Sequence, residues 1–327
     1  MKNNAKEVII DGKTVRLTNL DKLMWPDDGI TKAELIKYYA DMADVLLPYL
    51  RDRLFVMSRY PDGVDGQMFY QKDCPDYGPE WLTIFPVDSP DVKKTVNYIV
   101  CNERAALLWL ANQACIELHI WLAKIPRINY PDIAVFDLDP FEPAAFTDTL
   151  EIALMVKEAL SQFGLEGYPK TSGATGLHIF VPIIPEYTYQ EVRNAVEFIC
   201  RQIHSVFPQK TTLERLITDR TGKVYLDYLQ NTRGKTMTFQ YSLRPLPGAP
   251  VSTPLTWDEI KTGRVLPNDF RIDNISDRLA DVGDLYTDLL NSRQSLKNLV
   301  NLASDKFLPS KQENKNLPRK RLKTVRV

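Results

Sequence analysis

AVFDLDP, residues 134–140, joins a short apolar run to two carboxylates. The run has the length of a buried strand, and side chains two residues apart on a strand point to the same face. Asp137 and Asp139 would therefore converge on one point. Because a buried charge without a partner is costly, a metal ion or a ligand is the expected neutralising group. The stretch predicts a sheet that carries an acidic site on one face.

A second strand-like run, VYLDYLQN at residues 224–231, contains Asp227. If this strand lies beside the first, its carboxylate completes a cluster of three. Mg²⁺ and Mn²⁺ prefer such oxygen ligands. Two ions about 3.5–4 Å apart would activate an attacking hydroxyl group and stabilise the leaving pyrophosphate oxygen. A lone Asp-x-Asp is more often a turn, a cap or a solvated pair, so the neighbouring motifs must decide.

The segment KTSGATGLHIFVPI, residues 170–183, supplies phosphate-binding chemistry. Small residues at 172, 173 and 176 form a loop whose backbone N–H groups could approach a phosphate closely. Ser172, His178 and Lys170 would add side-chain donors. Taken alone, the loop is equally typical of an ordinary turn, and His178 could be a core histidine.

A series of motifs in one order resembles the polymerase domain of bacterial ATP-dependent DNA ligase D, part of the archaeo-eukaryotic primase superfamily. The resemblance runs from about Thr18 to about Asp284. The motifs are TNLDKLMWP, SRYPDG, FYQK, ELHIW, VFDLDP, KTSG, GLHIFVP, VYLDYLQN and YSLRPLPGAPVSTPLTWDEI.

The resemblance implies roles for the catalytic residues. Asp137, Asp139 and Asp227 match metal ligands. The residues that match the triphosphate-binding and neighbouring active-site positions are Ser172, His178, Arg244, Lys170 and His119. Arginine suits this task because its planar fork stays charged and binds phosphate oxygens. His119 could equally pack at a helix end.

The resemblance also implies a DNA-end site in the amino-terminal third. Asn19, Lys22 and Lys32 match positions that hold a 5′-phosphate, whose negative charge favours nearby ammonium groups. Phe69 and Tyr70 match an aromatic pair that stacks on the template strand. The ordinary alternatives are solvated lysines and an aromatic pair that is half core and half exposed.

Composition limits the class of protein. The chain has 327 residues, 44% of them apolar, and no apolar run approaches the roughly 18 residues of a membrane span. The absence of a signal-peptide core and of a C-x-x-C pair among four cysteines predicts a cytoplasmic, reduced protein. Cys101, Cys115 and His119 have loosely zinc-like spacing, although small buried cysteines are favoured.

The net charge of −1 argues against indiscriminate coating of DNA, so local basic patches must bind it. One such patch is the predicted basic flexible tail at 309–327, which is either a solubilising end or a non-specific DNA tether. Its basic residues are Lys311, Lys315, Arg319, Lys320, Arg321, Lys323 and Arg326.

Apolar periodicity predicts helices at about 31–47, 103–119, 147–163 and 189–206, the first opened by a Thr31–Glu34 capping box. The expected fold is α+β. A primase-polymerase-like catalytic core at 131–300, with a mixed or antiparallel sheet covered by helices, follows an amino-terminal DNA-end lobe at 1–130.

Together the motifs predict a metal-dependent, template-directed polymerase that uses Mn²⁺ or Mg²⁺ and adds nucleoside triphosphates, NTP or dNTP, to a primer 3′-OH. The resemblance implies ribonucleotide preference, gapped or broken DNA as substrate, non-homologous end joining with a Ku protein and a ligase, and a place at the bacterial nucleoid. No ligase-type lysine motif follows the polymerase-like region, so we expect the ligase to act in trans, or the chain to be an excised domain. A de novo primase and a non-catalytic end-binding scaffold are the alternatives.

Overall fold

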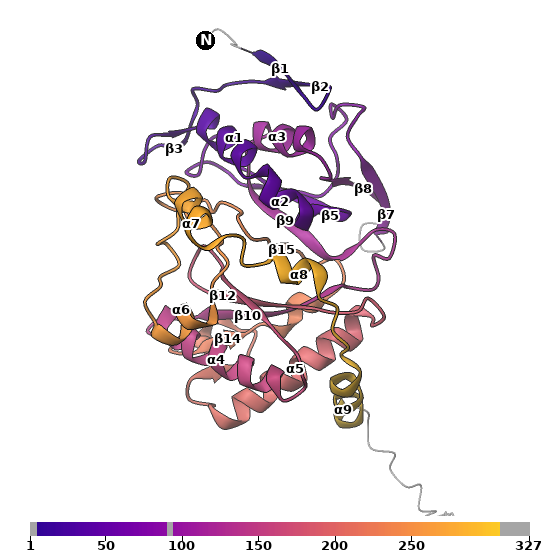
Figure 1. Cartoon of the computed structure of the whole chain (residues 1–327), viewed down its shortest axis with the longest axis vertical. Coiled ribbons are helices and arrows are strands. Elements are labelled where there is room, and N and C mark those ends of the chain that lie inside the picture. The colour runs from indigo at the N-terminus through magenta and orange to yellow at the C-terminus, as the bar shows by residue number, and fades with distance from the viewer. Residues whose placement is uncertain (1–4, 90–93, 308–327) are drawn as a thin grey trace, which may run out of the picture.

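The structure is a computed structural model that describes residues 5–89 and 94–307. It contains two main β-sheets with helices packed against them, so the predicted α+β class is confirmed. In Figure 1 the amino-terminal elements gather at the top and the strands of the second sheet lie below them. The carboxy-terminal segment runs along the side of both parts.

The amino-terminal part is built on a six-stranded sheet with the order β15-β9-β5-β8-β7, and β6 pairs with β5 off this path. Its strands are β5 (Arg53–Arg59), β6 (Phe69–Gln71), β7 (Ile84–Ser89), β8 (Lys94–Val100), β9 (Cys115–Lys124) and β15 (Met237–Thr238). The helices of this part are α1 (Lys32–Asp41), α2 (Ala43–Leu50) and α3 (Arg104–Asn112). Two small hairpins complete it: β1 (Lys6–Ile10) with β2 (Lys13–Leu17), and β3 (Leu23–Trp25) with β4 (Ile30–Thr31).

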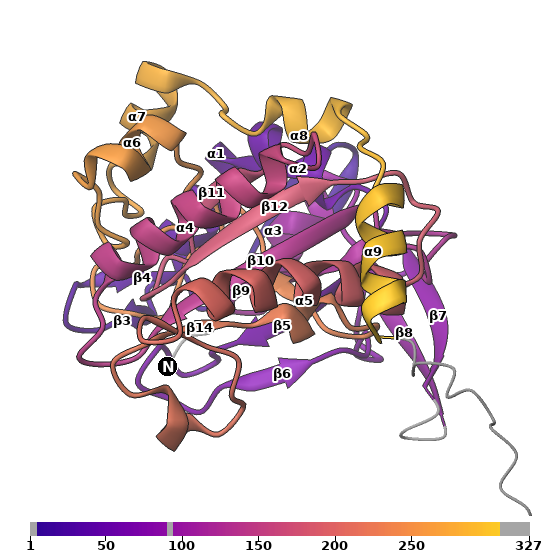
Figure 2. The same ribbon diagram turned by 90° about the horizontal axis from the view of Figure 1, so that it is seen from below.

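The second sheet has five strands in the order β11-β12-β10-β14-β13. Every pair is antiparallel except β13–β14, so the sheet is mixed, as predicted. Its strands are β10 (Ile133–Pro140), β11 (Tyr168–Thr171), β12 (Leu177–Pro182), β13 (Thr211–Thr212) and β14 (Val224–Leu226). Helices α4 (Phe146–Ser161) and α5 (Tyr189–Val206) cover one face of it, as Figure 2 shows. Two short 3₁₀ helices flank β14: η1 (Ile217–Arg220) and η2 (Tyr228–Asn231).

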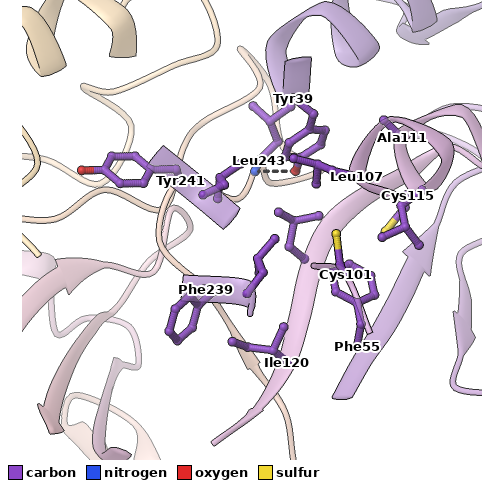
Figure 3. Packing of buried hydrophobic residues seen from close by; sticks show 14 of the residues in the cluster. Tyr39, Phe55, Cys101, Leu107, Ala111, Cys115, Ile120, Phe239, Tyr241 and Leu243 are labelled. Carbon is purple, nitrogen blue, oxygen red and sulfur yellow. Dashed lines mark hydrogen bonds between the residues drawn. The ribbon is translucent and has the colours of Figure 1, made fainter. Parts of the chain in front are cut away.

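After β15 the chain packs against both sheets and then forms four helices. These helices are α6 (Trp257–Thr262), α7 (Ile275–Val282), α8 (Thr287–Asn291) and α9 (Lys297–Phe307). The segment that follows β15 enters the amino-terminal core, where Phe239 and Leu243 join residues such as Tyr39 and Phe55 in one apolar cluster (Figure 3). The backbone N–H of Leu243 also donates to the hydroxyl of Tyr39 at 3.2 Å. Strand β15 and the segment after it therefore belong to the amino-terminal sheet and core, although they follow the catalytic strands in the sequence. The boundary at residue 130 stays a prediction.

Two of the predicted helices can be compared directly with the structure. Thr31 and Glu34 form the predicted capping box at the start of α1, with the Glu34 carboxylate accepting from the Thr31 N–H at 2.7 Å. The single helix predicted over 31–47 is instead two, α1 and α2, because the chain turns at Met42. The helix predicted at 189–206 is confirmed as α5.

The helix predicted over 103–119 is wrong in its second half. Helix α3 ends at Asn112, Ala114 takes a left-handed backbone conformation (φ +58°), and strand β9 begins at Cys115. A continuous apolar run is typical of both a buried helix and a buried strand, so periodicity alone did not locate the change. His119 consequently lies in the middle of a strand and not at a helix end.

A buried ion pair joins the two sheets. Arg53, on β5, places its guanidinium on both carboxylate oxygens of Asp132, at 2.6 and 2.9 Å. Asp132 precedes β10, and both side chains are less than a tenth exposed. The same guanidinium group lies over the ring of Phe239, 5.8 Å from its centroid. The pair therefore fixes the start of the strand that carries Asp137.

We expect Asp132→Ala to lower the free energy of unfolding by about 3–5 kcal/mol, because it leaves the buried Arg53 charge uncompensated. Asp44→Ala is the matched control, since Asp44 is 83% exposed in its pair with Arg104, and we expect it to cost at most about 1 kcal/mol. Urea unfolding of both variants measures the difference. Equal losses in the two variants would contradict the role given to the buried pair.

Candidate active site

Strand β10 brings the predicted catalytic residues together through its register. Asp137 is paired with His178 on β12, and Asp139 is paired with Tyr225 on β14. The prediction that the two acidic strands are neighbours is therefore confirmed. Asp227 lies one residue beyond β14, where it caps η2, and its N–H donates to the Asp137 carbonyl at 2.9 Å.

Six of the predicted site residues line one cavity of about 260 Å³ between the two sheets. The predicted residues that line it are His119, Asp137, Asp139, Ser172, His178 and Arg244, and the others are Ala174, Thr175, Gln230, Thr236, Met237 and Thr238. One wall of the cavity carries the carboxylates, and the other carries Arg244 and His119. Such a cavity suits a ligand that bears negative charge and also needs a cation.

The two cavity carboxylates are strongly perturbed. Burial, then the charge of Asp227, raises the pKa of Asp137 to about 7. Burial, then the charges of Asp137 and Asp227, raises the pKa of Asp139 to about 8. Oδ1 of Asp137 lies 3.2 Å from Nε2 of His178 but has no hydrogen-bond partner among the described residues. A cation bound here would satisfy that oxygen and offset the repulsion.

Asp227 is engaged locally. Its carboxylate accepts hydrogen bonds from the Tyr225 hydroxyl at 3.2 Å, the Leu229 N–H at 3.0 Å and the Gln230 amide at 3.0 Å. Within 5–89 and 94–307, no three or more His, Cys, Asp or Glu side chains form a group that could hold a metal ion. Asp137 and Asp139 have the donor chemistry for a hard divalent cation. The set of three metal ligands stays a prediction.

The loop after β11 is shaped by two glycines. A Cβ on Gly176 would lie 2.7 Å from Oδ1 of Asp139, and a Cβ on Gly173, whose φ is +75°, would lie 2.7 Å from Cγ of Arg244. The hydroxyl of Ser172 accepts from the N–H groups of Ala174 and Gly176 at 3.1 and 3.0 Å. These two N–H groups therefore close the loop, and the Ser172 hydroxyl keeps its own proton for donation to a ligand.

Lys170 and His178 differ in their access to the cavity. Lys170 is fully buried and does not line the cavity; its ammonium group donates to the hydroxyl of Ser252. Burial and the neighbouring Arg244 charge lower its pKa well below the usual value. Burial, then Lys170, likewise lowers the pKa of His178 well below its usual value. His178 is therefore neutral at physiological pH and is available as a hydrogen-bonding group.

Three residues of the site escaped prediction from the sequence. Glu117 lies behind His119 and Arg244, Thr238 accepts from Arg244 Nη1 at 2.8 Å, and Gln230 spans the Asp227 carboxylate and the cavity. A signal exists only for Glu117, which precedes His119 by two residues and so shares its face of a strand.

A second cavity of about 550 Å³ adjoins the first, with which it shares His119, Gln230 and Thr236. Basic and aromatic side chains line it, among them Tyr70, Lys72, Tyr98, Trp121, Arg233 and Lys235. The ring of Tyr70 meets that of His119 edge to face, with centroids 5.7 Å apart. Phe69 is 46% exposed but does not line this cavity, because neighbouring residues of a strand point to opposite faces.

The predicted 5′-phosphate residues lie close together. Lys22 N–H donates to the Asn19 carbonyl at 3.1 Å, and Lys32 N–H donates to the Lys22 carbonyl at 2.8 Å. Burial, then the charges of Lys22 and Arg59, lowers the pKa of Lys32 to about 8. Lys22 also pairs with Asp62 at 2.7 Å. Arg59, which was not predicted from the sequence, makes this a cluster of three cations.

The zinc alternative has no support among the described residues, where no group of three or more His, Cys, Asp or Glu side chains could hold a metal ion. Cys101 and Cys115 are fully buried, and burial raises the pKa of both thiols. The basic tail lies outside the described residues. No helix in the described part of the chain is both long and apolar enough to span a bilayer.

Comparison with known proteins identifies the family. The sequence model described as "LigD, primase-polymerase domain" matches residues 31–286. The chain belongs to the LigD primase-polymerase domain family. The LigD polymerase domain solved from Mycobacterium tuberculosis, whose title describes it as in complex with DNA, matches with a TM-score of 0.80 and 30% identity. The match covers 86% of this chain and 99% of that one.

Curated LigD relatives are longer than this chain. The bifunctional non-homologous end joining protein LigD of Bacillus subtilis is 36% identical over 86% of this chain and 45% of its own length. The multifunctional LigD of Mycolicibacterium smegmatis is 35% identical over 84% of this chain and 36% of its own length. The chain thus spans less than half the length of these LigD proteins.

The raised pKa values predict a pH-dependent response to Mn²⁺. Protonated Asp137 and Asp139 stabilise the metal-free fold, and this contribution is lost as pH rises from the unfolded value near 4 through the folded values of about 7 and 8. Because Mn²⁺ competes with these protons, its affinity should rise between pH 6 and 8 by up to roughly tenfold per pH unit for each proton that it displaces.

Thermal melts at pH 6, 7 and 8, with and without Mn²⁺, measure this response. We expect the shift caused by Mn²⁺ to grow with pH and to disappear in Asp137→Asn. A shift that is independent of pH, or that persists in this variant, would place the bound ion elsewhere.

Proposed function

We propose that this chain is a template-directed nucleotidyltransferase that adds nucleotides from NTP or dNTP to a primer 3′-OH and releases pyrophosphate. The observation that carries the proposal is the cavity that Asp137 and Asp139 share with Arg244 and His178. Carboxylates that can hold a cation, beside groups that can bind phosphate, are what phosphoryl transfer requires. The known family adds to this argument, since the matched model describes a primase-polymerase domain.

Divalent metal, Mg²⁺ or Mn²⁺, would be held by Asp137 and Asp139, with Asp227 as the third predicted ligand. When bound, it supplies positive charge that stabilises the reacting oxygens. Arg244 binds the triphosphate through its planar guanidinium, and Ser172 donates its hydroxyl proton to the same group. His178, neutral because it is buried, adds a hydrogen bond without adding charge. Lys170 is buried next to these residues, and its ammonium group donates to the hydroxyl of Ser252.

The adjoining cavity is the proposed path of the nucleic acid. Arg233 and Lys235 supply charge for the phosphate backbone, while the exposed Tyr70 supplies a ring face for a base. The structural relative from Mycobacterium tuberculosis is described in complex with DNA, which favours this placement. Phe69 is exposed but points to the opposite face of β6, so only Tyr70 is proposed to stack on a template in this cavity. The stacking role of Phe69 stays a prediction.

The cation cluster of the amino-terminal lobe is the proposed 5′-phosphate site. Burial, then the charges of Lys22 and Arg59, lowers the pKa of Lys32. A terminal phosphate would offset the repulsion between Lys32 and these two cations, and Asn19 lies beside the cluster to donate a hydrogen bond. This site would favour gapped or broken DNA with a 5′-phosphate over DNA that lacks one.

The cellular role follows from the relatives. Both LigD proteins compared above carry non-homologous end joining in their names, and we propose the same repair route for this chain. A Ku protein and a DNA ligase activity would be its partners, in the bacterial cytoplasm at the nucleoid. Ribonucleotides are the proposed preferred substrates.

The direct test is incorporation on a short gapped duplex, with and without a 5′-phosphate at the gap, in Mn²⁺ and in Mg²⁺. We expect phosphate-stimulated extension that falls by roughly 10²–10³-fold or more in Asp137→Ala, because the charge that balances the reacting phosphate is lost. Asp44→Ala, on the surface, should extend like wild type. Primer-free dinucleotide synthesis would favour a primase. Tight end binding without incorporation would favour a scaffold.

The pKa of Lys32 predicts how the 5′-phosphate preference depends on pH. A lysine with a pKa of about 8 is mostly charged at pH 7 and mostly neutral at pH 9. The affinity for 5′-phosphorylated over 5′-hydroxyl gaps should therefore fall by up to roughly tenfold across this range. Fluorescence anisotropy of the two duplexes measures it. In Lys32→Arg the preference should stay level, because arginine remains charged; an unchanged slope would show that another group is responsible.

A further inference from the structure

A buried carboxylate stands behind the phosphate-binding wall of the cavity. Glu117, on β9, is 7% exposed and does not line the cavity. Its Oε1 lies 3.1 Å from Nε of Arg244, and its Oε2 lies 3.5 Å from Nε2 of His119. One carboxylate thus touches both of the cavity groups that face Asp137 and Asp139.

Further contacts fix the same groups. Thr238 is paired with His119 across β15 and β9, and its hydroxyl lies 3.5 Å from Nε2 of that histidine. The hydroxyl also accepts from Nη1 of Arg244 at 2.8 Å. Glu117 is paired with Ser58 on β5, and a hydrogen bond from the Ser58 side chain helps to lower the pKa of the Glu117 carboxyl group. Among the residues in these contacts, Glu117 is the one that carries a negative charge.

The charge state of Glu117 follows from these neighbours. Burial opposes ionisation, but the His119 hydrogen bond and the Arg244 guanidinium outweigh it and lower the pKa of Glu117. The carboxylate is therefore ionised at neutral pH. Burial, then the charge of Arg244, lowers the pKa of Lys170 well below its usual value, so Arg244 is the charged partner of Glu117 on this wall. Glu117 balances the charge of that guanidinium.

The stem of Arg244 packs closely against Gly173, because a Cβ added there would lie 2.7 Å from Cγ of Arg244. Nη1 donates to Thr238, whereas Nε is held near Glu117 by the ion pair and has no hydrogen-bond partner among the described residues. The Thr238 hydrogen bond and the charge of Glu117 therefore orient the guanidinium. Preorganised donors of this kind bind phosphate oxygens without paying the entropy of ordering.

We propose that Glu117 is a positioning residue that holds Arg244 and His119 in the orientation that binds the triphosphate of the incoming nucleotide. This inference rests on the proposed function. Glu117 touches no ligand itself and acts through the two cavity side chains. Its loss should weaken nucleotide binding while leaving the carboxylates that hold the cation in place.

The test is Glu117→Gln, which keeps the shape and removes the charge. We expect the KM for ATP on a gapped duplex to rise by roughly tenfold with a smaller change in kcat, because binding in the ground state is what is lost. Glu151→Gln is the matched control, since Glu151 pairs with Lys210 at the surface. An unchanged KM in Glu117→Gln would overturn the proposal.

A double variant separates positioning from a general structural effect. If Glu117 acts through Arg244, adding Glu117→Gln to Arg244→Ala should change the KM little further. Independent, multiplicative losses would overturn the proposal. Should Glu117→Gln fail to fold by circular dichroism, Glu117→Asp keeps the buried charge and shortens its reach. A raised KM in that variant supports the proposal, and a wild-type KM overturns it.

Calorimetric titration of ATP with Mn²⁺ present is measured in the same variants. If wild type binds ATP but extends no primer, the polymerase proposal fails, while the ATP affinity of Glu117→Gln still decides the role of Glu117. Wild-type affinity in that variant would overturn the positioning role.

Discussion

The register of β10 between β12 and β14 is the constraint on which the site depends. It sets Asp137 opposite His178 and Asp139 opposite Tyr225, and it carries Asp227 to the end of the neighbouring strand. A slip of one residue would turn both carboxylates to the face covered by α4 and α5. The buried pair of Arg53 and Asp132 secures the start of this strand against the other sheet. Strand β10 therefore positions the catalytic residues and also begins at the ion pair that stabilises the contact between the sheets.

Both sheets contribute side chains to the site. The five-stranded sheet supplies Asp137 and Asp139, and the six-stranded sheet supplies His119 and Glu117 from β9. Arg244 reaches the cavity from the chain that follows β15, so its place depends on a strand pairing between residues more than a hundred positions apart. The cavity is thus a property of the contact between the sheets and belongs to neither sheet alone.

The sequence predicted the site best where polar side chains lie on or beside a short apolar run that is typical of a strand. Asp137, Asp139, Ser172 and His178 lie on or beside short apolar runs, and the structure brings them into one cavity. It failed where an apolar run has no period of its own: residues 103–119 contain a helix, a turn and a strand. The spacing of Glu117 and His119 indicates that they share a strand face, but the contact of Glu117 with Arg244 could not be recognised before β15 and Arg244 were placed beside β9. The local hydrogen bonds of Asp227 could not be predicted from the sequence either, because they depend on the 3₁₀ helix η2 that follows the strand.

The return of the chain into the amino-terminal core bears on how the protein is made. Phe239, Tyr241 and Leu243 belong to the same apolar cluster as Tyr39 and Phe55. During synthesis, the first lobe leaves the ribosome long before these residues exist. Its core lacks these side chains until they arrive, so the lobe reaches its final packing only after the strands of the catalytic sheet have been translated. The apolar cluster of the catalytic part likewise includes Leu296 and Leu299, so both cores depend on residues from the last third of the chain.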